Sequence, residues 1–512
     1  MIEENKSSMK NSVRRLIIAG IGVLIQIIWV VVLVMRLNQY SQIITLLTVA
    51  IELVLVLAVY SMDTNAAFKL PWIILITVAP IVGICVFFLF GRSGATKKVR
   101  ARYRKIDQQL FAYLNQDEQI IEELSKKDER LANDFKYLWK CASSPVYKNT
   151  DVKYYGDTCD AMAAQLEDMM QAKKFIFLEY HAIEMAESFQ ALRKVLMAKA
   201  REGVEIRILY DDAGCIGFLN PRFIKYMESM GIQCRVFNPI MPVLNIFMNN
   251  RDHRKITVID GKVAYTGGYN LADEYFNITH PYGQWKDSGI RFEGDAVQTA
   301  TILFLEMWNA LKEQDVDIEK HLPVYPYKAK EQGFFALYGD SPLDKEPAGE
   351  NVYMNLLRHA KKYIYFTTPY LILSDEMTRE LTGAAKRGVD VRIITPGIPD
   401  KKTIFQVTKS YYPQLLKHGV KIYEYTPGFM HEKQCICDGE IVVVGTINLD
   451  FRSLYLHFEN AALFCGYEAV SHVKEDFDAL FPICKDMSKE PSERTRRLRL
   501  SQLILRLFSP LM

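Results

Sequence analysis

The residues best suited to chemistry in this 512-residue chain form one set that occurs twice with the same spacing. In each copy a Lys lies two positions after a His, and an Asp lies five positions after that Lys. A Gly lies seven positions after the Asp, and an Asn lies three positions after the Gly. The copies are His253, Lys255, Asp260, Gly267 and Asn270, and His431, Lys433, Asp438, Gly445 and Asn448. Because the chain has only nine His, two matching sets 178 residues apart indicate a duplicated functional motif.

Each motif also predicts its own local structure. Apolar residues alternate with others after the Lys, which predicts a strand, a Gly turn and a second strand. Residues i and i+2 of a strand share a face, so each His and its Lys point the same way. An imidazole with a pKa of about 6.5 can act as nucleophile, acid or base near neutral pH. Two such motifs facing each other would place two imidazoles and two ammonium groups at one point, which predicts a site for phosphate.

The paired motifs resemble the active-site motif of the phospholipase D superfamily, present here twice without a gap. The resemblance implies double displacement at a phosphodiester, in which His253 forms a phosphohistidine and His431 protonates the departing alcohol. It also implies that no metal or cofactor is required. The phosphate oxygens would be held by Lys255, Lys433, Asn270 and Asn448. Asp260 and Asp438 complete the catalytic motif, but their position before a Gly predicts a structural role in the turn.

Two further carboxylates match the residues that orient the catalytic His in this superfamily. Asp287 lies 34 residues after His253, which it would orient, and Glu459 lies 28 residues after His431, which it would orient. A carboxylate on the second ring nitrogen would fix the tautomer and orientation of each imidazole. The alternative is that either residue is a plain surface carboxylate.

The pattern around the motifs predicts an α/β protein with an internal duplication. Strand–helix–strand patterns at 174–211 and 362–396 match each other, and the strands predicted at 231–237 and 419–425 lead into the two motifs. Such units predict two mainly parallel sheets flanked by helices and related by a pseudo-two-fold axis, as in the phospholipase D fold. We assign 151–320 and 348–485 to the halves and 321–347 to a linker, within which 333–338 has the pattern of an opening strand.

The N-terminal part, residues 1–92, has the composition of a membrane anchor. Apolar runs at 16–35, 43–60 and 70–90 predict two or three hydrophobic helices. A cleaved signal peptide is the weaker alternative for the first run, because no small-residue cleavage site follows it. Basic residues at 10–15 and 92–104 favour a cytoplasmic catalytic part of a multi-pass protein in the bacterial cell membrane. The stretches 65–72 and 89–92 resemble the anchor of bacterial cardiolipin synthases.

The segments on either side of the duplicated part are charged. Residues 93–150 predict a charged helical connector without chemistry of its own. In 486–512, apolar residues follow one helical face between Arg residues, which predicts an interfacial helix on anionic lipid. The alternative is a tail helix that packs on the catalytic part. The ending at 508–511 also resembles cardiolipin synthases.

The net charge of +3 and the absence of a Cys-x-x-Cys pair give no sign of a nucleic-acid, metal or disulfide protein. Gly268, where many superfamily members carry Ser, again resembles the bacterial cardiolipin synthases. That family transfers a phosphatidyl group between two phosphatidylglycerol molecules and releases glycerol. A hydrolytic phospholipase D, a phosphatidylserine synthase, a nuclease and a non-catalytic membrane scaffold are the alternatives. The acceptor alcohol and the oligomeric state stay open.

Overall fold

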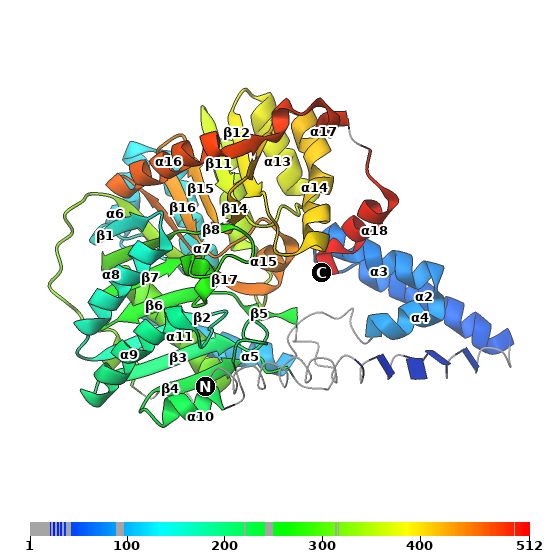
Figure 1. Cartoon of the computed structure of the whole chain (residues 1–512). Helices are drawn as coiled ribbons and strands as arrows, with labels where there is room; N and C mark the ends of the chain where they lie inside the picture. The colour runs from blue at the N-terminus through cyan, green and yellow to red at the C-terminus, as the bar shows by residue number, and fades with distance from the viewer. Residues whose placement is uncertain are drawn as a thin grey trace.

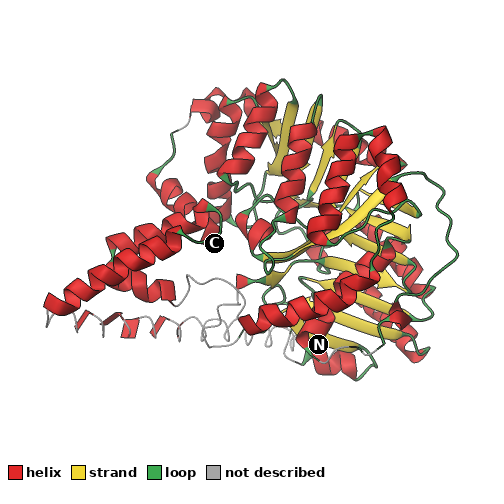
Figure 2. Ribbon diagram, turned by 180° about the vertical axis from the view of Figure 1, so that it is seen from behind, coloured by secondary structure: helices red, strands yellow, loops and turns green. Residues whose placement is uncertain are grey.

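Two sheets, each covered by helices on its outer face, form the body of the molecule (Figures 1 and 2). The computed structural model describes residues 42–88, 97–219, 222–240, 249–312, 315, 317–495 and 497–511, with isolated residues between 21 and 36. The α/β architecture and its duplication agree with the sequence prediction.

The first sheet has the strand order β1-β9-β7-β6-β2-β3-β4. Its strands are β1 (Thr150–Tyr155), β2 (Phe175–Tyr180), β3 (Glu205–Asp211), β4 (Gln233–Phe237), β6 (Lys255–Ile259), β7 (Val263–Gly267) and β9 (Gly289–Gly294). Its helices are α8 (Thr158–Met170), α9 (Glu187–Arg201), α10 (Phe223–Glu228) and α11 (Val297–Leu311).

The second sheet repeats this plan in the order β10-β17-β16-β15-β11-β12-β13-β18. Its strands are β10 (Phe334–Asp340), β11 (Tyr363–Thr367), β12 (Asp390–Pro396), β13 (Lys421–Tyr425), β15 (Gln434–Cys437), β16 (Ile441–Gly445), β17 (His457–Cys465) and β18 (Cys484–Asp486). Its helices are α12 (Ala348–His359), α13 (Asp375–Lys386), α14 (Lys402–Lys417), α15 (Phe451–Tyr455) and α16 (Glu468–Leu480). Strand β10 lies within the stretch assigned to the linker and pairs along β17.

The prediction of mainly parallel sheets is wrong, because both sheets are mixed. Only β2-β3-β4, the equivalent β11-β12-β13 and the two-residue strand β5 beside β17 pair in parallel, and the other pairs in both sheets are antiparallel. The reason lies in the motifs themselves. Each one folds as a hairpin, β6–β7 or β15–β16, and strands joined by a tight turn must run antiparallel.

One hydrophobic core lies between the sheets and joins the halves. It contains Phe177 and Val258 of the first sheet, Phe335 and Ile436 of the second, and Phe304 of helix α11. Helix α11 is buried almost all round, which explains its largely apolar sequence. The halves therefore form one rigid unit in which elements of one sheet can position residues of the other.

The predicted connector holds three helices, α5 (Lys97–Leu110), α6 (Glu118–Lys127) and α7 (Glu129–Ala142), that pack on the catalytic body. Helix α5 contacts α11, and α7 contacts α12 and β10. Asp117 and Asp128 cap the N-termini of α6 and α7 by accepting backbone N–H groups.

Ahead of them, α2 (Gln42–Tyr60), α3 (Ala66–Val78) and α4 (Pro80–Val86) project from the body as a separate helical cluster (Figure 1). The predicted run over 70–90 is not one helix, because Pro80 starts α4 at a sharp bend after Val78. Among the described residues, no helix combines the length and apolar character required of a membrane span. Most of the run at 16–35 lies outside the described residues.

The tail contains α17 (Pro491–Thr495) and α18 (Leu500–Phe508). Helix α18 packs on α14 and α3, and the buried Gln502 donates a hydrogen bond to the backbone of Gln406. Its opposite face exposes Leu500, Leu503 and Ile504. The packing agrees with the alternative of a tail helix on the catalytic part, and the interfacial role of its exposed apolar face stays a prediction.

Candidate active site

Each motif hairpin is fixed by its Asp. Asp260 and Asp438 have left-handed backbone, with φ of 55° and 53°, which Asp tolerates better than most residues. The Asp260 carboxylate accepts N–H groups of Lys173, Lys174 and Phe175 at 2.7–2.9 Å. Asp438 accepts the equivalent N–H groups of residues 361–363 at 2.7–2.8 Å. These carboxylates lie at the opposite end of the strand from the His, so the geometry supports the turn-capping role and not direct catalysis.

The orienting carboxylates are exchanged between the halves. His253 Nδ1 lies 2.8 and 2.9 Å from the two oxygens of Glu459, and His431 Nδ1 lies 2.6 Å from Asp287 Oδ2. The expectation that each carboxylate serves the His of its own half is therefore wrong. An ionised carboxylate can only accept, so the Nδ1 of His253 carries the proton and its Nε2 is left free to react. His431 Nδ1 lies between two groups, the Asp287 carboxylate and Lys433 Nζ at 2.8 Å.

Strand pairing across the interface between the halves explains the exchange. Strand β5 (Arg251–Asp252) pairs with β17, and His253 N–H donates to Phe458 O at 2.9 Å, one residue before Glu459. In the same way β14 (Gly428–Met430) pairs with β8 (Gln284–Lys286), and His431 N–H donates to Lys286 O at 2.8 Å, one residue before Asp287. The register of each short parallel pair therefore brings a His alongside the carboxylate of the other half.

The two motifs share one buried electrostatic site. Burial lowers the pKa of His253 well below its ordinary value, and the charges of Lys255 and Lys433 lower it further. Burial also lowers the pKa of Lys255 to about 8, against the opposing effect of Glu459. The pKa of Lys433 falls to about 7 by burial, with Asp287 opposing and Lys255 adding to the fall. Because each motif alters the ionisation of the other, the lysines and histidines form one centre that an anion would stabilise.

The two Asn differ in how the protein uses them. Asn270 Oδ1 accepts the Ala182 N–H at 3.1 Å, and its Nδ2 donates to the Tyr275 hydroxyl at 2.8 Å. Asn448 Oδ1 is buried without a hydrogen-bond partner among the described residues. An unpaired buried amide oxygen can accept a hydrogen bond from a hydroxyl group of a ligand. The phosphate-binding role predicted for the pair stays a prediction, and Asn448 is the member with a free acceptor.

Five ring residues around the two His escaped prediction, because they lie outside the repeated spacing. The imidazoles of His181 and His457 pack on His253, with ring centroids 5.0 and 5.5 Å away. The rings around His431 are those of Tyr275, Trp285 and Phe429, at 5.2, 5.0 and 5.7 Å. Their only sequence signal is position: His457 lies two residues before Glu459, and Trp285 two before Asp287.

His253, His457 and Glu459 are of types that can ligate a metal, and their donor atoms lie within 4.8 Å of one another. The surroundings favour an anion instead. The Glu459 carboxylate already accepts hydrogen bonds from His253, from the Ser453 hydroxyl at 2.6 Å and from the Thr446 hydroxyl. The positive charges of Lys255 and Lys433 also act on His253. A phosphodiester therefore suits this centre better than a cation.

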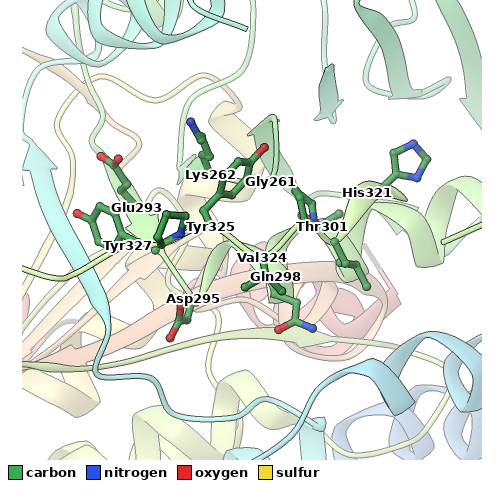
Figure 3. Close-up of a pocket in the computed structure, with 14 residues that line it drawn as sticks. Gly261, Lys262, Glu293, Asp295, Gln298, Thr301, His321, Val324, Tyr325 and Tyr327 are labelled. Carbon is green, nitrogen blue, oxygen red and sulfur yellow. The ribbon is translucent and has the colours of Figure 1, made fainter. Parts of the chain in front are cut away.

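The cavity of about 320 Å³ shown in Figure 3 is separate from the candidate active site. It lies between the first hairpin turn, at Gly261 and Lys262, and the segment from His321 to Tyr327. None of the motif His or Lys residues lines it, so it takes no part in the candidate active site.

Comparisons with known proteins show the family of the chain. The family described as "Cardiolipin synthase, PLD-like domain" matches residues 166–308 and 353–481, one segment in each half. An uncharacterized protein of Streptococcus mutans is 39% identical over 460 residues, covering 90% of this chain and 99% of its own. A cardiolipin synthase of Halalkalibacterium halodurans is 32% identical over 442 residues, covering 86% of this chain and 87% of its own.

Among solved structures, a phosphatidylserine synthase of Haemophilus influenzae has the same fold. It aligns with a TM-score of 0.57 over 75% of this chain and 98% of its own, at 12% identity. At that identity the likeness concerns the fold alone. The duplicated motif, its exchange of carboxylates and the family match over more than half of the sequence lead to one conclusion: the chain belongs to the cardiolipin synthase family with phospholipase D-like domains.

Proposed function

We propose that the protein joins two phosphatidylglycerol molecules, transferring the phosphatidyl group of one to the primary hydroxyl of the other and releasing glycerol. The observation that carries this proposal is the convergence of two His–Lys pairs, each His held by a carboxylate of the opposite half. Family membership supports the same reaction, since the named relatives include cardiolipin synthases.

In the first step, His253 Nε2 attacks phosphorus, a P–N bond forms and the P–O bond to the departing glycerol breaks. His431 supplies the proton that the glycerol oxygen takes up. Burial lowers the pKa of His431 to about 3 in the free protein, with Lys433 adding to the fall. A bound diester anion would offset the lysine charge and raise this pKa, so substrate binding itself favours the acid form of His431.

In the second step, the primary hydroxyl of the acceptor gives its proton to His431 while its oxygen attacks phosphorus. The P–N bond then breaks, which restores His253 and completes the new diester. Lys255 and Lys433 would hold the non-bridging oxygens and stabilise the charge of both transition states. Asn448, with its unpaired Oδ1, can accept a hydrogen bond from a further hydroxyl of the alcohol.

The test is to incubate the purified full-length protein with phosphatidylglycerol alone and identify the products by mass. Cardiolipin and glycerol in equal amounts are expected. Phosphatidic acid without cardiolipin would instead favour hydrolysis, because water would then be the acceptor. Adding serine to the same assay checks the phosphatidylserine alternative.

We further propose that the protein is a multi-pass protein of the cytoplasmic membrane with its catalytic part on the cytoplasmic side. The apolar runs and the basic residues that flank them support this placement. A Cys-free variant with Lys328→Cys offers the test, since Lys328 is exposed. An impermeant thiol reagent should label it only after cells are opened, and labelling of intact cells would contradict the proposal.

A further inference from the structure

A cavity of about 800 Å³ separates the α2–α3 helices from the catalytic body. Two contacts hold α3 against α15, the helix that follows the second motif. Asn65 Nδ2 donates to the Tyr455 hydroxyl at 3.2 Å, and the Phe68 ring packs edge-on against Phe451 and Tyr455 at 5.6 and 5.5 Å. The cavity volume lies within the range of about 300–1,000 Å³ typical of small-molecule sites.

The lining of this cavity is amphipathic. Its apolar part consists of Val59, Met62, Phe68, Trp72, Leu454 and Leu456. Its charged part has five carboxyl groups, those of Asp63, Asp340, Glu346, Glu350 and Glu376, against the three cations of Lys69, Arg100 and Lys345. This excess of carboxyl groups makes the cavity less favourable for a phosphate than the site at Lys255 and Lys433. The lining therefore fits a neutral, partly apolar group attached to a phosphate.

His457 connects the cavity with the reaction centre. It lines the cavity, its ring lies 5.5 Å from the His253 ring, and its Nδ1 lies 3.7 Å from Glu459 Oε1. The cavity thus lies on the His253 side of the centre, with the His457 ring between it and His253, and none of the rings around His431 lines it. In an in-line displacement the leaving and incoming alcohols occupy the side of phosphorus opposite the nucleophile. The substituent that stays on phosphorus is equatorial, beside the two non-bridging oxygens, so it leaves the path of the alcohols free and can extend past His253 toward the cavity.

We propose that this cavity receives the diacylglycerol part of the phosphatidyl group while that group is attached to His253. The inference rests on the proposed function, in which His253 is the nucleophile. Helix α2 exposes an apolar face that includes Leu46, Leu53 and Leu57, and α18, which packs on α3, exposes Leu503 and Ile504. These faces border the cavity helices and give a lipid tail an apolar route to it.

Photo-crosslinking provides a direct test with the full-length protein in mixed micelles. The probe is phosphatidylglycerol with a diazirine on one acyl chain. Adducts are expected on residues 59–72 and 454–456, and adducts found only elsewhere would overturn the proposal. If adducts form here but the wild-type protein makes no cardiolipin, the cavity assignment stands while the proposed function fails.

A matched pair of variants gives a kinetic test. Met62→Trp fills the cavity, whereas Leu57→Trp adds the same ring on the exposed face of α2. The measured quantity is kcat/KM for phosphatidylglycerol divided by kcat/KM for a p-nitrophenyl phosphodiester without acyl chains. Displacing a few methylene groups should lower this ratio about tenfold in Met62→Trp, mainly through KM. Equal ratios in the two variants would refute the assignment, and activity on the small diester shows that each variant is folded.

Discussion

His253 lies between two further imidazoles, whereas His431 is enclosed by the rings of Tyr275, Trp285 and Phe429. The backbone around them is the same: a hairpin, an Asp that ties its turn and a carboxylate from the other half. Duplication has therefore kept the parts that position each His and changed the rings around it. Two equally positioned imidazoles in different surroundings can take different roles, and the predictions below test whether they do.

Replacing either His should have the largest effect and should separate the two roles. Both His253→Ala and His431→Ala should lose transfer between phosphatidylglycerol molecules, by about 10²-fold or more for loss of the acid alone. With p-nitrophenol as leaving group, no proton is needed at that oxygen. His431→Ala should then still form a phosphoenzyme, and His253→Ala should form none.

Mapping of the trapped phosphohistidine by mass spectrometry checks this division of labour. A phosphoenzyme on His431, formed in the His253→Ala variant, would reverse the two roles. The diacylglycerol cavity would then adjoin the acid and would need another occupant, so the outcome also bears on the assignment of the cavity.

Exchange of the carboxylates predicts a crossed pattern in double variants. Glu459→Gln and Asp287→Asn each replace a carboxylate, which can only accept, by an amide whose NH2 can donate to the imidazole and favour the wrong tautomer, a change that costs up to about 10⁴-fold in a comparable His–Asp pair. In a His431→Ala background, Asp287→Asn should lower phosphoenzyme formation little further, because the imidazole that Asp287 orients is already absent. Glu459→Gln should still lower phosphoenzyme formation there, since His253 keeps its role.

The matched measurement is the rate of p-nitrophenol release in the two double variants, with His431→Ala alone as the reference. If Asp287→Asn rather than Glu459→Gln lowers that rate, each carboxylate serves the His of its own half. That result would contradict the strand pairing that places His253 beside Glu459.

The lysines predict a moderate effect of pH. Their folded pKa values, about 8 for Lys255 and about 7 for Lys433, lie below the ordinary value, so each ammonium is charged below its pKa and loses charge as the pH rises through it. The diester keeps its negative charge over this range. We therefore expect kcat/KM for the small diester to fall between about pH 7 and pH 9.

Lys433→Arg sharpens this test, because a guanidinium stays charged throughout the range. Near pH 6 its kcat/KM should be lower than that of the wild type, because the planar guanidinium places its N–H donors differently from an ammonium. With rising pH, however, its kcat/KM should fall less. A profile that falls as steeply as that of the wild type would show that Lys433 is not the titrating group.

The repeated spacing predicted the two hairpins, and the strand–helix–strand pattern predicted the helices between parallel strands, because local pattern and turn chemistry determine these. Prediction from the sequence failed where distant segments meet. Glu459 and Asp287 exchange partners through β5 and β14, which are too short to be recognised as strands. His181 and His457 carry no periodic signal, and only the fold brings them to His253. The break at Pro80 was visible as a residue, yet the apolar run around it concealed the bend.

The smallest effect on the chemistry should come from Asp260 and Asp438, which serve the two halves alike. Asp260→Ala removes an acceptor of three backbone N–H groups and places Ala at positive φ, so it should lower the free energy of unfolding by about 1–3 kcal/mol. Asp260→Asn keeps a side chain that tolerates this backbone and should lose less. Asp478→Ala, at an exposed carboxylate paired with Lys474, is the surface control and should change stability by less than about 1 kcal/mol.

Denaturant titration measures the free energy of unfolding of each variant. The amount of phosphoenzyme formed per folded molecule measures the effect on the chemical step. If Asp260→Ala abolished phosphoenzyme formation while leaving stability intact, Asp260 would act in catalysis, and the two ends of the motif strand would have to be regarded as one site.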